Sequence, residues 1–292
     1  MKFTKTLLAT VLFSFSVLGA TQVAYAYTAE QEKQFQQALD AAYDNDFDTA
    51  FKLFQSLEKQ GVSEAEYNLG LMYQNGFGTK QDYAEAEKWF RKAAERGDEM
   101  AQVNLGLMYL EGQGVVQNDS EAVKWFRKAA EQEVPDAQYN LGVMYRDGRG
   151  VKQDYVETVK WFRKAAEQGD SAAQGNLGAM YANGQGVKQD NTEAVKWLRK
   201  AVEQGNARAQ VNLGLMYHKG AGVKQDYAKA LEWFEKAAEQ DDWQAFLLLA
   251  DAYLKGYGIK QDPLKAREYF AHACYAGVQE ACDMYRQLNE TQ

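Results

Sequence analysis

Proline is nearly absent from this sequence, with two residues in 292, and cysteine and histidine are equally scarce at two each. Because proline interrupts helices, its scarcity favours a chain built mainly from helices. The two histidines, His218 and His272, stand apart and have no Cys or carboxylate pattern typical of a metal site around them. The few serines include none in a Gly-x-Ser-x-Gly context. We therefore expect no metal site, no cofactor and no catalytic residues.

Long apolar runs are also missing, except at the beginning of the chain. Lys2 and Lys5 precede an apolar stretch over residues 7–18, and residues 24–26 (Ala-Tyr-Ala) have the small-residue pattern of a processing site. A membrane anchor needs about 20 apolar residues, and this stretch is shorter and interrupted by Ser and Thr. We predict that residues 1–26 are a signal peptide, cleaved near Ala26, so that the mature protein is periplasmic or secreted. An uncleaved anchor is the alternative.

Positive charge is in deficit, with 33 Lys and Arg against 41 Asp and Glu, which gives a formal net charge of −8. Loss of the predicted signal peptide removes two lysines and no acid, and takes this charge to −10. Such a surface repels phosphate backbones and anionic lipid. We expect no nucleic-acid partner, no membrane span after the signal peptide, and a monomer.

Glycine, in contrast, is plentiful, and its positions are periodic. The string Asn-Leu-Gly-x-Met-Tyr begins at Asn68 and recurs every 36 residues through Tyr217, with a degenerate sixth copy over residues 248–253. A Gly-x-Gly begins three residues after each Tyr, and a Trp-Phe pair or a variant of it follows. Six copies in one register indicate an internal repeat, which is typical of a solenoid.

Each repeat predicts two helices. Leu69 and Met72 fall at helical spacing on one apolar stripe, and Phe90 and Ala94 do so on a second stripe. Between the stripes, Gly-x-Gly provides the backbone freedom for a bulged turn. An Asp or Asn, such as Asp82, then stands where its side-chain oxygen would cap the second helix.

The combined pattern of Ala-x-x-x-Leu-Gly-x-x-Tyr, Gly-x-Gly-Val-x-x-Asp and Ala-x-x-Trp-Phe-x-x-Ala-Ala resembles the Sel1-like repeat family, relatives of the tetratricopeptide repeats. The resemblance implies an all-α, right-handed superhelical solenoid of antiparallel helix pairs. We expect a tetratricopeptide-like capping hairpin over 27–60, a closing helix over 277–292, and six repeats between them, at 61–96, 97–132, 133–168, 169–204, 205–240 and 241–276.

Cys274 and Cys282 lie eight residues apart across the turn at Gly277. In an exported chain such a pair predicts a disulfide, with free buried thiols as the alternative. The spacing also resembles the cysteine-rich branch of Sel1-like proteins, in which bridges tie one repeat to the next. Here a bridge would hold the closing helix.

The candidate binding surface comes from columns of the first helix that differ between repeats. They lie at offsets 0, 3, 7 and 10 from the position of Glu64, and we expect them to form one face opposite the core stripe. In the fourth repeat all four members are small, which predicts a hollow walled by larger residues of the third and fifth repeats. The hollow consists of Ala172, Gly175, Ala179 and Ala182, and its walls of Tyr139, Val143, Arg146, Arg208, Val211, Leu215 and His218. The alternative is that a tight superhelix has no room for larger side chains there.

The resemblance implies a scaffold that is not an enzyme and that binds a protein or peptide in the bacterial envelope or on a host cell. Two other functions stay open. One is a penicillin-binding or β-lactamase-like activity, as described for cysteine-rich Sel1-like proteins, although this chain has one Cys pair and no visible catalytic set. The other is an immunity or holding protein for a co-encoded toxin.

Overall fold

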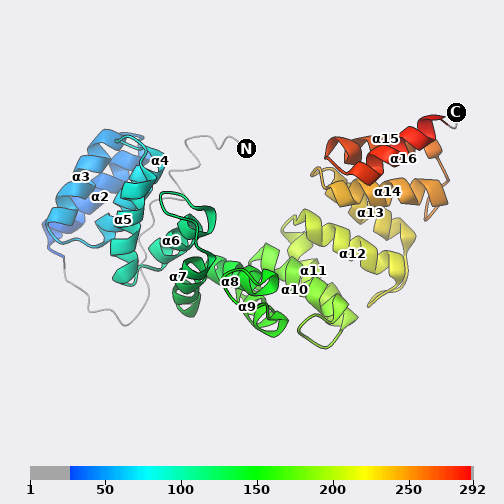
Figure 1. The fold of residues 1–292 in the computed structure, drawn as a ribbon, viewed down its shortest axis with the longest axis horizontal. Coiled ribbons are helices and arrows are strands. Elements are labelled where there is room, and N and C mark those ends of the chain that lie inside the picture. The colour runs from blue at the N-terminus through cyan, green and yellow to red at the C-terminus, as the bar shows by residue number, and fades with distance from the viewer. Residues whose placement is uncertain (1–26, 291–292) are drawn as a thin grey trace. The chain divides into compact units, whose positions relative to one another are not determined.

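A computed structural model of the chain describes residues 27–290, and the predicted signal peptide over 1–26 lies outside them. The described residues form fifteen helices and no strand (Figure 1). In chain order these are α2 (Ala29–Tyr43), α3 (Phe47–Lys59), α4 (Glu64–Asn75), α5 (Tyr83–Glu95), α6 (Glu99–Glu111), α7 (Asp119–Glu131), α8 (Pro135–Asp147), α9 (Tyr155–Glu167), α10 (Ser171–Asn183), α11 (Asn191–Glu203), α12 (Ala207–Lys219), α13 (Tyr227–Ala238), α14 (Trp243–Lys255), α15 (Pro263–Tyr275) and α16 (Gln279–Glu290).

The helices are distributed over two compact units. Among the described residues, the first unit contains 27–137 and 149–152, and the second contains 138–148 and 153–290. In the first unit each helix from α2 to α7 packs against the next one in the chain, and in the second unit the same is true from α9 to α16. The all-helical prediction is confirmed, with two helices for each repeat.

The two helices of a repeat cross closely because a glycine stands at the crossing point. A Cβ built on Gly70 would lie 2.6 Å from the ring of Phe90, which is fully buried. Leu69 and Met72 of the predicted first stripe are also fully buried. The glycine of the repeated Asn-Leu-Gly string therefore makes room for the large aromatic residue of the second helix.

Polar side chains cap the starts of the second helices, as predicted, and glycines end first helices. The carboxylate of Asp82 accepts hydrogen bonds from the backbone N–H groups of Ala84 and Glu85, at 2.9 and 3.0 Å, which caps α5. Gly76 ends α4 in the left-handed conformation, with φ of 70°. The same two devices recur along the array, for example at Asp190 and Gly184.

The second glycine of each Gly-x-Gly has a role that its turn position did not reveal. A Cβ built on Gly186 would lie 2.0 Å from the backbone carbonyl oxygen of Tyr155, the first residue of the preceding repeat's second helix. A Cβ built on Gly78 would likewise lie 2.1 Å from the carbonyl oxygen of Phe47. The turn thus packs directly on the repeat before it, and only a residue without a side chain fits.

Buried amide pairs join successive repeats, and the apolar periodicity did not predict them. Gln174 is buried, donates from Nε2 to the carbonyl oxygen of Ala166 at 3.0 Å, and accepts a hydrogen bond from Nε2 of Gln204 at 2.9 Å. This amide pair therefore links the second helices of two successive repeats through the first helix between them. Equivalent pairs are Gln102 with Gln132, Gln138 with Gln168, and Gln210 with Gln240.

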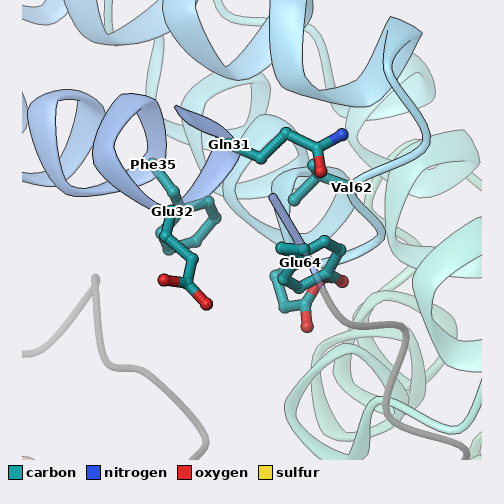
Figure 2. Close-up of a pocket in the computed structure, with 6 residues that line it drawn as sticks. Gln31, Glu32, Phe35, Val62 and Glu64 are labelled. Atoms are coloured by element: carbon teal, nitrogen blue, oxygen red, sulfur yellow. Dashed lines mark hydrogen bonds between the residues drawn. The ribbon is translucent and has the colours of Figure 1, made fainter. Parts of the chain in front are cut away.

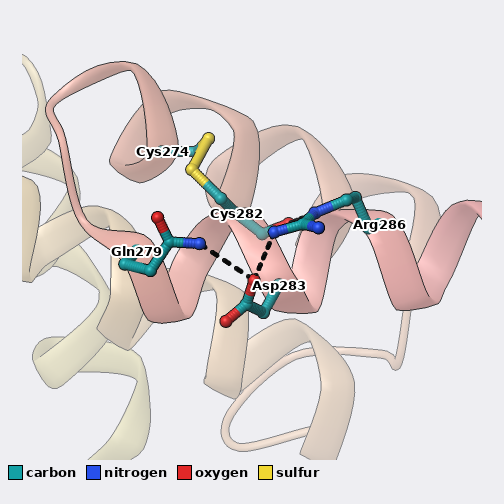
Figure 3. The surroundings of a disulfide bond; sticks show 5 residues. All are labelled: Cys274, Gln279, Cys282, Asp283 and Arg286. Carbon is teal, nitrogen blue, oxygen red and sulfur yellow. Dashed lines mark hydrogen bonds and ion pairs between the residues drawn. A yellow bond between two sulfur atoms is a disulfide. The ribbon is translucent and has the colours of Figure 1, made fainter.

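The two cysteines stand at repeat positions whose residues form a hydrogen bond with each other in other repeats. Cys274 on α15 and Cys282 on α16 form a disulfide in the structure, with Cα atoms 4.7 Å apart (Figure 3). Their separation of eight residues equals that of Ala166 and Gln174, and both pairs stand at the same places in the repeat. A covalent bond thus replaces a hydrogen bond at the last junction.

Candidate partner-binding surface

The predicted surface lies on the first helices α8, α10 and α12, and all of its residues belong to the second unit. Nine of the eleven predicted residues are accessible to solvent. Arg208 is exposed, and the other eight are partly exposed, namely Tyr139, Val143, Arg146, Ala172, Ala179, Ala182, Leu215 and His218.

The prediction that all four columns share one exposed face is wrong at two residues of the column at offset 3. Gly175 and Val211 are buried, although Tyr139 of the same column is partly exposed. A Cβ on Gly175 would stand 3.5 Å from the Cβ of Ala209 in the next first helix, and Val211 belongs to a buried cluster with Ala237 and Ala245. The first helix contacts its own second helix and also the next repeat, so its buried arc is wider than one apolar stripe.

The three alanines of the fourth repeat remain as a small-residue surface on α10, which packs against α12. Ala172, Ala179 and Ala182 are partly exposed, and Leu215 of α12 is partly exposed as well. On the side of the third repeat, the ring of Tyr139 stacks on Phe162, with centroids 5.6 Å apart. The surface is thus apolar and has short side chains in its middle.

Two of the predicted wall residues have intramolecular partners. The guanidinium of Arg146 donates two hydrogen bonds to the carboxylate of Asp147, at 2.7 and 2.9 Å, and this carboxylate raises the pKa of Arg146. The ring of His218 meets Tyr227 and Tyr257 edge-on, with centroids 5.0 and 5.1 Å away. His218 therefore belongs to an aromatic cluster between the fifth and sixth repeats.

No group of three or more His, Cys, Asp or Glu in residues 27–290 has a geometry that could hold a metal ion. His272, the other histidine, stacks on Phe246 with centroids 5.1 Å apart, in a different cluster from His218. Over the same residues, no helix combines the length and apolar character needed to cross a membrane.

A small pocket near the start of the described chain was not predicted. It is lined by Tyr27, Gln31, Glu32, Phe35, Val62 and Glu64 (Figure 2). The hydroxyl of Tyr27 donates a hydrogen bond to the carboxylate of Glu64. Burial of the Tyr27 side chain, and to a lesser extent this hydrogen bond, raises the pKa of Tyr27 to about 12. Because the polar groups of Tyr27 and Glu64 bond to each other, the pocket joins α2 to α4 and presents little to a ligand.

The 36-residue period of these helix pairs is that of a known repeat family. A model of the Sel1 repeat matches six consecutive segments, at residues 63–98, 99–134, 135–170, 171–206, 207–242 and 245–278. The chain belongs to the Sel1 repeat family. Its architecture is accordingly a solenoid related to tetratricopeptide repeats, and Sel1 repeats typically serve as scaffolds for protein–protein interaction.

Solved Sel1 repeat structures resemble this chain over most of its length. A protective antigen of uropathogenic Escherichia coli strains with an SLR fold matches with a TM-score of 0.76 and 36% identity over 89% of this chain. The match spans 59% of the E. coli chain. A Sel1 repeat protein from Oxalobacter formigenes matches with a TM-score of 0.75 and 33% identity, over 84% of this chain and 97% of that one. No curated protein matches in sequence.

Proposed function

We propose that this Sel1 repeat protein is an exported scaffold that binds a protein or peptide through the first helices α8, α10 and α12. One observation carries the proposal. At offsets 0, 7 and 10 the side chains of these helices are accessible to solvent, and they differ from repeat to repeat, whereas the core columns are nearly identical. Packing leaves these positions free, so their variation is available for recognition.

We also propose that this scaffold is not an enzyme. Sel1 repeats are generally non-enzymatic scaffolds. The two histidines lie in separate aromatic clusters. On each of α5, α7, α9 and α11 a glutamate pairs with the lysine three residues later, as Glu157 does with Lys160 at 3.0 Å. Hydrolysis of nitrocefin by the purified protein would contradict this view.

Export to the periplasm or beyond the cell is the second part of the proposal. The basic and apolar start of the sequence supports it, as does the cysteine pair, which is suited to an oxidising compartment. The E. coli relative is described as a protective antigen, which is consistent with a protein that reaches the cell surface. We propose that this chain works in the bacterial envelope or in contact with host proteins.

A charge placed in the middle of the surface tests the binding role. We expect Ala179→Glu to abolish capture of the partner from envelope fractions or host-cell lysate, because a partner would have to bury the new carboxylate. Helicity and melting temperature should not change, since Ala179 is partly exposed. The measurement is a pull-down analysed by mass spectrometry, with circular dichroism of each variant.

The matched control is Ala228→Glu, the same substitution at an exposed position of the second helix α13. It should capture the same proteins as the unchanged chain. If Ala179→Glu still captures them, or if both variants lose them equally, the proposed surface is wrong.

A further inference from the structure

The charges on two neighbouring first helices depart from those of the rest of the molecule. The chain has an excess of acidic residues and a formal net charge of −8. Yet α10 and α12 contain no Asp or Glu between them, and α12 carries Arg208 and Lys219 in addition to His218. The first helices α4 and α6, in contrast, each carry two acids and no base.

The two cations of α12 are exposed and have no intramolecular counter-charge. Among the described residues, neither Arg208 nor Lys219 lies within ion-pair distance of a carboxylate. The bases on the first helices α8 and α14 are paired, Arg146 with Asp147 at 2.7 Å and Lys255 with Asp251 at 2.7 Å. An anionic group brought to α12 would therefore find two cations that are not already neutralised.

Arg208 does not stabilise the helix that carries it. It lies in the first turn of α12, where the helix dipole is positive and a cation is unfavourable. The equivalent residues of the first and third repeats are Glu64 and Asp136, which suit that position. A role outside the helix accounts for Arg208 better than local stability does.

An apolar surface adjoins these cations. Ala172, Ala179 and Ala182 of α10 and Leu215 of α12 are partly exposed, and their short or aliphatic side chains make no charge–charge contact. The first turn of the next first helix, α14, holds Trp243, whose exposed fraction is 44%. Exposed tryptophan and arginine are the residue types that contribute most at protein interfaces.

We propose that the surface of α10 and α12 binds an acidic segment of a partner protein, with carboxylates at Arg208 and Lys219 and small apolar side chains over the alanines. This inference rests on the proposed binding function and adds the chemistry of the ligand. A basic segment is disfavoured, because it would meet two uncompensated cations. The attraction between exposed charges also makes the binding sensitive to salt.

A display experiment with random dodecapeptides tests this inference without knowledge of the partner. The protein is purified from cells that express the full-length coding sequence, so that its N-terminus is processed naturally. Peptides are selected on the unchanged protein and counter-selected on Ala179→Glu. We expect the selected pool to be enriched in Asp and Glu, and its best members to lose at least tenfold in affinity on Arg208→Glu/Lys219→Glu.

The matched control is Lys188→Glu/Lys224→Glu, which makes the same change of net charge at two exposed lysines of the inter-helix turns. It should bind the selected peptides as the unchanged protein does. Circular dichroism checks that every variant is folded.

The remaining outcomes separate this inference from the proposed function. Peptides that depend on Ala179 but are not acidic, or are indifferent to Arg208→Glu/Lys219→Glu, would overturn the inference and leave the binding function intact. Equal loss on the control variant would show general charge attraction and would also overturn the inference. A pool with no peptide that depends on Ala179 would overturn both.

Discussion

At Glu66 the first repeat buries a carboxylate where four other repeats bury a glutamine amide. Glu66 forms ion pairs with Lys92 at 3.1 Å and with Arg96 at 3.2 Å, and Arg96 stands where Gln132 stands in the second repeat. In the sixth repeat the same two positions hold Phe246 and Ala276. One junction is thus made in charged, amide and apolar versions, and burial raises the pKa of Glu66 despite the two cations.

Replacing Glu66 and Arg96 by the glutamine pair of the other repeats tests whether burial of the Glu66 carboxylate is unfavourable. We expect Arg96→Gln to destabilise the first repeat by about 1–3 kcal/mol, because Lys92 alone then faces the buried carboxylate. The double variant Glu66→Gln/Arg96→Gln should recover most of this loss. Hydrogen exchange of the α4 and α5 amides measures both. Destabilisation of the double variant that equals or exceeds that of Arg96→Gln would contradict the argument.

The raised pKa of Glu66 defines how the free energy of unfolding changes with pH. The pKa of Glu66 is higher in the folded than in the unfolded chain, so the folded state binds the proton more tightly. The stabilisation from protonation is therefore lost as pH rises above 4.5, the ordinary pKa of a glutamate. The stability of Glu66→Gln/Arg96→Gln relative to that of the unchanged protein should therefore rise as pH rises through that window and then level off. A relative stability of the double variant that falls over the same window would show that the carboxylate is favourably buried.

The turns within each repeat differ from ordinary helix–helix connections in that they also form the contact with the preceding repeat. Gly184 and Gly186 have almost the same φ, 66° and 67°. Their surroundings differ, because a Cβ on Gly184 would meet the side chain of Gln189 at 3.3 Å, whereas one on Gly186 would overlap the Tyr155 carbonyl at 2.0 Å. The pair separates backbone strain from steric contact within a single turn.

Substitution of each glycine by alanine tests the two effects. Gly184→Ala should cost about 1–2 kcal/mol for the left-handed backbone. Gly186→Ala should cost the same strain plus about 1–3 kcal/mol more, because the turn must move off the preceding repeat. Urea unfolding followed by circular dichroism compares them. Equal losses for the two variants would show that the turn can shift freely and that the close contact is unimportant.

In a repeat array each repeat contacts only its neighbours, so that the ends of the array have fewer stabilising contacts than its middle. At the beginning, α2 and α3 supply a core that includes Phe35, Phe54 and Leu57. At the other end, α16 buries Ala281 alone among its residues, and the Cys274–Cys282 bridge joins it to α15.

Removal of that bridge should therefore have a local effect. We expect Cys274→Ser/Cys282→Ser to lose about 2–3 kcal/mol by the chain-entropy model for so short a loop. The loss should appear as faster hydrogen exchange in α15 and α16, while α4 and α5 keep their protection. A uniform loss of protection along the chain would show that the array unfolds as one cooperative unit.

The amino-acid sequence by itself was sufficient to predict the helices, their caps, the six repeats and the family. A strict period makes every position that packing or capping requires recognisable in the sequence. The tertiary structure decided which sides of the first helix are covered. Periodicity reveals the residues that share a side of a helix, but Gly175 and Val211 are buried by the next repeat, which the helix's own period does not encode. Likewise, only the approach of one repeat to another explains Gly186 and the buried Gln174.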